Sequence, residues 1–386
     1  MPDSDSALPP DDPEITSPEA QDLDQITGPM RRRVTSRAEP ISLHDQSASS
    51  EPYIIRPDSF ESAVRTPQQT LEWYRRKRRR QLWISLFLFA ATVVSTTLVF
   101  SRYRPIELLP GFFDEEIRTR MVVIMERRDP SPPGEMKSFN QRYLDGLLLG
   151  FSYSGPLMLI LLCHEMGHFL QAVRYRVPAS FPFFIPLPIP PLGTMGAVIA
   201  QGRGAADRKQ MFDIAVSGPL AGLIVTLPVL FLGVSASHVD VIVPGYGNEF
   251  GEPLIIQWVI AWIHGPTPEG QTLYMNGVAF AGWVGVFVTA LNLIPIGQLD
   301  GGHLTYTLLG KPAHWIAKLL VGVAAAYMIY TGSYSYVLFL ILILFMGTNH
   351  PPTRDDTVPL GIGRQIIGWL TLAFLVIGFT PTPIIL

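Results

Sequence analysis

Long apolar runs, separated by short polar segments, make up most of the chain from residue 82 onward. A helix needs roughly 20 apolar residues to cross the roughly 30 Å hydrocarbon core of a bilayer. The pattern therefore predicts an all-α polytopic membrane protein with about seven transmembrane helices. The predicted spans are 82–100, 147–172, 211–234, 273–296, about 313–331, about 334–347 and about 365–380.

The composition agrees with a membrane protein. Of the 386 residues, 48% are hydrophobic, and the mean hydropathy is positive. A net charge of −3 argues against nucleic acid as a partner. The single cysteine, Cys163, excludes an intrachain disulfide.

The residues before the first predicted span differ in character. Residues 1–70 are rich in Asp, Glu, Ser and Pro, which predicts a disordered N-terminal tail, and their acidic start argues against a signal or transit peptide. The basic run "RRKRRR", Arg75 to Arg80, directly precedes the span. Such a run is typical of a site for nucleic acid or anionic lipid, or of a topology anchor that stays in the cytoplasm. Its place beside a span favours the anchor.

The charges of the loops predict the orientation. With the N terminus in the cytoplasm, residues 173–210 form an inner loop and residues 235–272 an outer loop. The inner loop contains five basic residues, whereas the outer loop contains no Lys or Arg. Residues 101–146 disagree, because this predicted outer loop holds eight basic residues, although an equal number of acidic residues balances them. We therefore expect a multi-pass protein with its functional site toward the cytoplasm. The expected location is a bacterial plasma membrane; a plastid membrane is the alternative if the tail is a transit peptide, which its acidic start disfavours.

The stretch "HEMGH", residues 164–168, places ionisable groups at the end of the second predicted span. His164 and His168 are four residues apart, so on a helix they share one face about 6 Å apart. Both imidazoles can then bind one metal ion, and Glu165 is placed to take a proton from the attacking water. Charges at membrane depth are costly, which favours this interpretation over a chance match or a set of mutually satisfied polar residues.

A catalytic zinc commonly has three protein ligands and an open position. The fourth predicted span ends in "LNLIPIGQLDGG", residues 291–302, where Asp300 lies at the same membrane side as the two histidines. Pro295 and the nearby glycines predict a break in the helix, which membrane depth tolerates where backbone faces protein or a wet cavity. Asp300 is the candidate third ligand. The alternative is a loop aspartate that caps a following helix.

Together, "HEMGH" and "NLIPIGQLDGG" resemble the two signature motifs of the site-2 protease family of intramembrane zinc metalloproteases. The stretch "SGPLAG", residues 217–222, is similar to the Gly-Pro motif that the family has on the helix between them. The likeness covers roughly residues 145–310 and implies a three-helix catalytic core. Its Pro-rich "PFFIPLPIPPLGTMGA" is closest to the cyanobacterial and plastid branch, and no stretch has the length or pattern of the PDZ or CBS domains of other members.

The resemblance implies the roles of five residues. His164, His168 and Asp300 are the implied ligands of one Zn²⁺ per chain, and Glu165 is the implied general base. Asn292 is implied near the site, where it holds the scissile carbonyl or its oxyanion, or instead makes an interhelical hydrogen bond.

The segment between the second and third spans is rich in proline. Six prolines from Pro178 to Pro191 exclude a helix or a central strand, so we expect irregular backbone along the membrane face. Residues 193–202 follow as an apolar stretch between glycines and predict a membrane-associated β-hairpin. In the family, a segment at this place pairs with the unwound substrate as an added strand; the alternative is a surface loop. The implied substrate-binding residues are Gly193, Thr194, Met195, Gly196, Ala197 and Val198.

The prediction is an intramembrane zinc metalloendopeptidase that hydrolyses peptide bonds in or beside the transmembrane helices of single-pass proteins in the bilayer. One alternative is an inactive protein of the same fold that binds membrane helices, and Glu165 argues against it. The other is a transporter with a His and Asp relay, and the clustering of these groups at one depth argues against it. His303 and His350 are expected to be interface or loop histidines rather than part of the site.

The expected organisation has four parts. They are the tail 1–70, the basic anchor with the first span and an extracytoplasmic loop 71–144, the metalloprotease core 145–310, and the C-terminal transmembrane helices 311–386.

Overall fold

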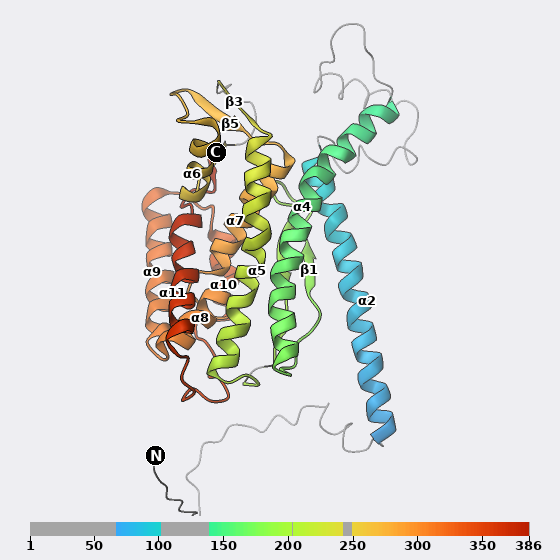
Figure 1. The fold of residues 1–386 in the computed structure, drawn as a ribbon, viewed down its shortest axis with the longest axis vertical. Helices are drawn as coiled ribbons and strands as arrows, with labels where there is room; N and C mark the ends of the chain where they lie inside the picture. Colours follow the sequence, from blue (N-terminus) through green and yellow to red (C-terminus); the bar gives the residue numbers. More distant parts are fainter. Residues whose placement is uncertain (1–66, 102–138, 203, 242–248, 386) are drawn as a thin grey trace, which may run out of the picture. The chain divides into compact units, whose positions relative to one another are not determined.

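The computed structural model describes residues 67–101, 139–202, 204–241 and 249–385 (Figure 1). These residues are mostly helical, with three small two-stranded sheets among them. The predicted tail up to residue 66 and most of the loop 101–146 lie outside the described residues. Helix α2 begins at Pro67, within the last residues of the predicted tail.

The elements follow in chain order. The helices are α2 (Pro67–Phe100), α4 (Phe139–Arg174), α5 (Arg208–Ser235), α6 (Leu254–His264), α7 (Gly277–Asn292), α8 (Asp300–Leu309), α9 (Ala313–Thr331), α10 (Val337–Met346) and α11 (Ile362–Gly378). The strands are β1 (Phe183–Pro186), β2 (Thr194–Val198), β3 (His238–Val241), β4 (Glu249–Phe250), β5 (Gln271–Tyr274) and β6 (Ile384–Ile385).

Among the described helices, four are long and apolar enough to cross a membrane. They are Arg75–Phe100, Tyr143–Arg174, Arg208–Ser235 and Ala313–Thr331. The prediction of seven spans is therefore not confirmed, because α7, α10 and α11 have only 16, 10 and 17 residues. At about 1.5 Å per residue, a 16-residue helix extends about 24 Å, which is less than the roughly 30 Å of a hydrocarbon core.

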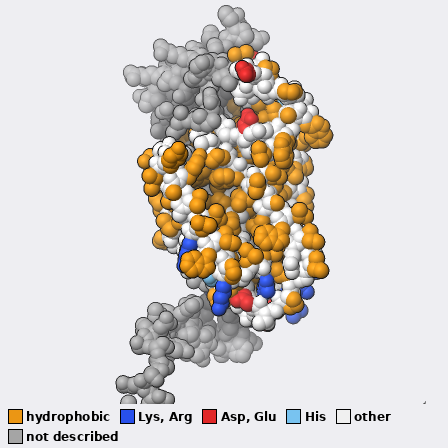
Figure 2. All heavy atoms as spheres, turned by 90° about the vertical axis from the view of Figure 1, so that its left-hand side faces the viewer, with side chains coloured by type: hydrophobic (Ala, Val, Ile, Leu, Met, Phe, Trp, Pro, Cys, Tyr) orange, Lys and Arg blue, Asp and Glu red, His pale blue; other side chains and the backbone are white. Residues whose placement is uncertain are grey.

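The outer surface of the helices is apolar, as expected for an integral membrane protein. Figure 2 shows hydrophobic side chains across the middle of one face, with charged side chains gathered toward the ends. Large apolar side chains such as Phe345 and Ile329 are 89% and 81% exposed. A water-soluble protein rarely exposes apolar patches of this extent, whereas lipid accommodates them.

Helices α4, α5 and α7 pack against one another and form the centre of the fold. Helix α5 begins with a capping box, in which Asp207 and Gln210 satisfy each other's backbone N–H groups. Its later turns approach α7 closely at glycines: a Cβ on Gly233 would lie 2.2 Å from the backbone nitrogen of Ala279, and one on Gly282 would lie 2.6 Å from Cα of Leu230. Close backbone contact at small residues is a common way for membrane helices to associate.

Three local predictions differ from the structure. The predicted outer loop contains α6, an apolar helix of 11 residues that is too short to count as a span. Helix α7 begins at Gly277 rather than at 273, because β5 pairs with β3 up to Tyr274 and Asn276 then caps the helix.

The third difference concerns the hairpin predicted within 193–202. This segment supplies one strand, β2, and its antiparallel partner is β1 from the Pro-rich segment. Proline is tolerated there because the pair is a two-stranded sheet, in which each strand has one edge without a partner strand.

Candidate metal centre

Helix α4 carries two of the candidate ligands on one face. His164 and His168 are one turn apart, and their Nε2 atoms lie 3.3 Å from each other. The His164 side chain is 5% exposed and that of His168 is 12% exposed. The local geometry is therefore the one predicted from the spacing of four residues.

A chain reversal brings Asp300 to the same place. Helix α7 ends at Asn292, and α8 begins at Asp300 after a turn that contains Pro295. The glycines that follow allow α8 to pack directly on this turn, since a Cβ on Gly301 would lie 2.0 Å from the carbonyl oxygen of Leu293. The predicted helix break is present, and Asp300 is the first residue of the next helix rather than its N-cap.

The three candidate ligands form a compact set. An Asp300 carboxylate oxygen lies 3.0 Å from Nε2 of His164, and the other lies 3.2 Å from Nε2 of His168. Ligands about 2.0–2.1 Å from a tetrahedral zinc ion lie roughly 3.3 Å apart, so the spacing of these atoms fits a zinc site. Two imidazoles and one carboxylate are also a donor set that zinc accepts.

Contacts with helix α5 hold the two imidazoles in position. The Nδ1 atom of His168 donates to the backbone carbonyl of Ile214 at 2.7 Å, which leaves Nε2 free of a proton for a metal. Gly218 faces the ring of His168, where a Cβ would lie 2.0 Å from Nε2, and Gly222 faces His164, where a Cβ would lie 3.0 Å from Nδ1. The glycines of "SGPLAG" thus make room for both candidate ligands.

Glu165 and the ligands line a cavity of about 230 Å³. Glu165 is 6% exposed and lies outside the three-residue ligand set. A buried carboxylate beside a metal site is suited to accept a proton rather than to bind solvent cations. Asn292 also lines the cavity, and its Nδ2 atom lies 3.4 Å from Nε2 of His164.

The sheet of β1 and β2 forms another part of the cavity wall. Of the six implied substrate-binding residues, Ala197 and Val198 line the cavity. The other four do not: Gly193 instead accepts a hydrogen bond from Ser95 of α2 at 2.7 Å, and Thr194 donates to the Ile185 carbonyl of β1. The structure therefore brings only the end of the predicted segment to the candidate site.

His303 and His350, expected to lie outside the site, form a pair at its border. Nδ1 of His303 lies 2.5 Å from Nε2 of His350, and the ring of Tyr306 stacks on His350. His303 lines the cavity, whereas His350 is 5% exposed and lies behind it. Burial and the adjacent His303 lower the pKa of His350 to about 3, so its ring is neutral at pH 7. No local spacing could reveal this pair, since its members are 47 residues apart.

Comparison with known protein families matches the part of the chain that contains the candidate site. The family model "Peptidase family M50" matches residues 153–331, which include the three candidate ligands, Glu165 and Asn292. The chain carries a peptidase family M50 domain. This confirms the resemblance drawn from the two motifs, since M50 is the family of the site-2 proteases.

Plant proteins are similar to the M50 domain and its surroundings. "Probable zinc metalloprotease EGY1, chloroplastic" of Arabidopsis thaliana is 29% identical over 227 residues, 58% of this chain and 41% of that protein. Its namesake from Oryza sativa subsp. japonica is 29% identical over 300 residues, 74% of this chain and 48% of that protein. "Probable zinc metalloprotease EGY2, chloroplastic" of Arabidopsis thaliana is 29% identical over 207 residues, 52% and 36% respectively. The chain spans less than half the length of these relatives.

Proposed function

We propose that this protein is a zinc metalloendopeptidase that cleaves peptide bonds in or beside the transmembrane helices of single-pass membrane proteins. The observation that carries the proposal is the meeting of His164, His168 and Asp300 within hydrogen-bond distance, beside Glu165, in a cavity among apolar helices. The M50 domain and the names of the plant relatives support the same chemistry.

The residues of the cavity have complementary roles in this proposal. His164, His168 and Asp300 would hold one Zn²⁺, which when bound supplies a Lewis acid for the scissile carbonyl and its attacking water. Glu165 accepts a proton from that water and passes it to the leaving amine. Asn292 donates an N–H to the carbonyl oxygen as negative charge develops there, and this is the role of an oxyanion-hole donor.

Strand β2 is the proposed binding site for the substrate backbone. One of its edges pairs with β1, which packs against α2, and its residues Ala197 and Val198 border the cavity. A substrate helix bound along β2 must first unwind, because its own hydrogen bonds occupy its carbonyls. Weak helix formers such as Gly, Pro or Asn near the cut therefore favour cleavage.

The proposed location is a bacterial plasma membrane, with the N terminus and the site toward the cytoplasm. The charge difference between the loops 173–210 and 235–272 supports this orientation. The plant relatives bear the word "chloroplastic" in their names, and this supports a plastid membrane as the alternative location.

The test compares the wild type with Glu165→Gln, a variant of nearly the same shape that cannot accept a proton. Zinc content and cleavage of a tagged single-pass substrate are measured in detergent. We expect about one zinc per chain in both proteins. The wild type should cleave the substrate, whereas Glu165→Gln and the wild type treated with a chelator should not. Glu269→Gln, which changes an exposed residue in a turn, serves as the matched control and should cleave like the wild type.

Two outcomes would contradict the proposal. Cleavage by Glu165→Gln at the wild-type rate would exclude Glu165 as the general base. Stable zinc binding, without cleavage of any of several substrates with weakened helices, would instead favour the inactive helix-binding protein.

A further inference from the structure

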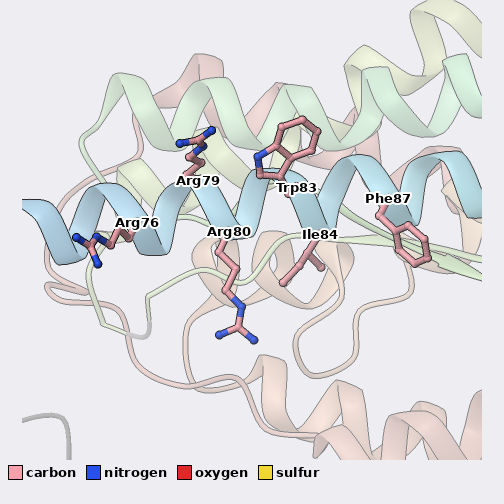
Figure 3. A pocket seen from close by; sticks show the side chains of 6 residues that line it. All are labelled: Arg76, Arg79, Arg80, Trp83, Ile84 and Phe87. Carbon is pink, nitrogen blue, oxygen red and sulfur yellow. The ribbon is translucent and has the colours of Figure 1, made fainter.

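The middle of α2 has a surface feature that the proposed peptidase activity does not use. Three guanidinium groups, of Arg76, Arg79 and Arg80, are followed along the helix by three apolar side chains (Figure 3). The apolar side chains are Trp83, Ile84 and Phe87. Together the six residues border an open recess of about 500 Å³, which we call the α2 patch.

The α2 patch faces away from the other described helices and strands. The opposite side of the helix is marked by Ser85, which is 7% exposed and donates to the Pro182 carbonyl, and by Arg78, whose guanidinium lies 5.6 Å from the Phe181 ring centre. With 3.6 residues per turn, the six patch residues lie within one face of the helix centred opposite Ser85. Trp83 and Phe87 are 62% and 72% exposed, so the described residues leave this face uncovered.

The patch lies where the polar part of α2 meets its membrane-crossing part. The candidate span begins at Arg75, and the charge-free run begins at Leu82. Guanidinium groups at such a boundary lie at the depth of lipid phosphates, and the apolar rings one to two turns further lie at the depth of the first acyl carbons. The exposed ion pair of Arg76 with Glu72, at 3.7 Å, competes weakly with a phosphate.

We propose that the α2 patch is a binding site for one anionic phospholipid. Its phosphate is held by Arg76, Arg79 and Arg80, and its acyl chain lies against Trp83, Ile84 and Phe87. The argument is charge complementarity together with the order of the two surfaces, which is the order of headgroup and acyl chain in a phospholipid. The proposal is independent of the peptidase activity, since the patch contains none of the residues of the metal centre.

A simpler role of the basic run makes a different prediction. If the six consecutive basic residues act only as an orientation anchor, their attraction to anionic lipid depends on the number of charges and not on their side of the helix. The helix supplies a matched pair of variants. Arg76→Gln/Arg79→Gln/Arg80→Gln removes the charges of the patch, and Arg75→Gln/Lys77→Gln/Arg78→Gln removes the same number from the other sides.

The experiment measures phospholipid retained by the full-length protein in detergent, with native mass spectrometry, after addition of phosphatidylglycerol or phosphatidylcholine. We expect the wild type and the Arg75/Lys77/Arg78 variant to retain phosphatidylglycerol in preference to phosphatidylcholine. The Arg76/Arg79/Arg80 variant should retain at most about one tenth of the phosphatidylglycerol that the wild type retains. Glutamine keeps the helix propensity in both variants, and elution as a single species checks their folding.

A third variant tests the apolar half of the site. Trp83→Ala/Phe87→Ala keeps all six basic residues and is expected to lower phosphatidylglycerol retention as well. Equal losses in the two charge variants, no preference of the wild type for phosphatidylglycerol, or full retention by the Trp83/Phe87 variant would each overturn the proposal.

Discussion

Gly218 decides the position of a candidate metal ligand although it has no functional group of its own. It lies against the His168 imidazole on the side facing α5, while Ile214 accepts a hydrogen bond from the other ring nitrogen. The backbone carbonyl of Ile214 thus holds one side of the ring, and the missing side chain of Gly218 leaves the space that the other side occupies. We therefore expect metal affinity to depend on Gly218 and Ile214, although neither residue would bind the metal itself.

Gly218→Ala is expected to displace His168, since a Cβ at this position would lie 2.0 Å from the Nε2 atom. Zinc affinity should fall by about 10–100-fold, in line with the loss of residues that orient ligands. Competition with a chromogenic chelator measures it. Gly322→Ala in α9, where nothing lies within 4 Å of the added Cβ, is the control and should bind zinc like the wild type.

Asn292→Ala distinguishes the two roles considered for this residue. As an oxyanion donor, Asn292 acts in the transition state, so its removal should lower kcat by about 10²–10³-fold with zinc content unchanged. As an interhelical hydrogen-bonding residue it would affect the melting temperature instead. Steady-state kinetics and thermal melting of the same preparation separate them, and a lower melting temperature with unchanged kcat would exclude the catalytic role.

At the scale of elements, polar contacts join α8 and α11 to the N-terminal part of α5. Arg364 of α11 makes two hydrogen bonds to Asp213 of α5, at 2.7 and 2.9 Å, and Tyr175 donates to the same carboxylate. Burial and this contact with Asp213 raise the pKa of Tyr175, which keeps it protonated and donating. Arg208 of α5 caps the last turn of α8 through the Thr307 carbonyl.

Arg364→Gln removes two charge-assisted hydrogen bonds and leaves the Asp213 carboxylate without its cation. The expected loss of stability is about 1.5–3 kcal/mol, as for hydrogen bonds to charged groups. Thermal melting in detergent measures it. Arg354→Gln is the matched control, because Arg354 is 60% exposed and lies 3.5 Å from Asp207, and an exposed pair contributes about 1 kcal/mol or less. Equal shifts in the two variants would show that Arg364 acts only as a surface charge.

The segment between α10 and α11 braces the turn that carries Asp300. Thr348 accepts a hydrogen bond from the backbone N–H of Gly297 at 3.1 Å, and His350 pairs with His303 in the first turn of α8. A Cβ on Gly297, which has a φ of 56°, would lie 2.4 Å from the Gly347 carbonyl oxygen, so the two backbones are in direct contact. The position of Asp300 therefore depends on a segment about 50 residues later in the chain.

His350→Ala is expected to loosen the first turn of α8 by removing the partner of His303. Zinc should dissociate about 10–100-fold faster, as after the loss of other outer contacts of metal ligands. His314→Ala is the control, because His314 donates to the same segment at the His350 carbonyl but does not contact His303. The expectation fails if both variants release zinc at the same rate.

At the scale of the whole molecule, the metal centre links parts of the chain that are distant in sequence. His164 and Asp300 are 136 residues apart, and a metal held by both would join α4 to α8. Such a metal binds the folded state and not the unfolded chain, so it stabilises the fold. The sheet β1–β2, helix α5 and the segment between α10 and α11 all border the same cavity. A substitution in any of them can therefore change the metal centre.

Zinc addition to the metal-free protein is expected to raise its melting temperature. At a free zinc concentration of 100 times Kd, binding stabilises the folded state by about 2.7 kcal/mol. The shift should disappear in His168→Ala, which lacks one candidate ligand. An equal shift in this variant would place the stabilising zinc elsewhere in the protein.

The sequence by itself determined the features that depend on nearby residues. The apolar runs predicted the membrane helices, although α7 and α10 are shorter than the spans predicted for them. The spacing of His164 and His168 predicted their shared helical face, and Pro295 with its neighbouring glycines predicted the break before Asp300. All these properties follow from the period of a single helix or from the backbone of single residues.

Only the tertiary structure decided which distant residues meet. It paired β2 with β1, placed Gly218 and Gly222 against the two histidines, and joined His303 to His350. These contacts depend on how helices approach one another, which the periodicity of a single helix does not encode. A glycine indicates that a close contact is possible, but the sequence does not show which residue makes that contact. The candidate ligands could thus be proposed from the sequence, whereas the contacts that hold them in place could be found only in the fold.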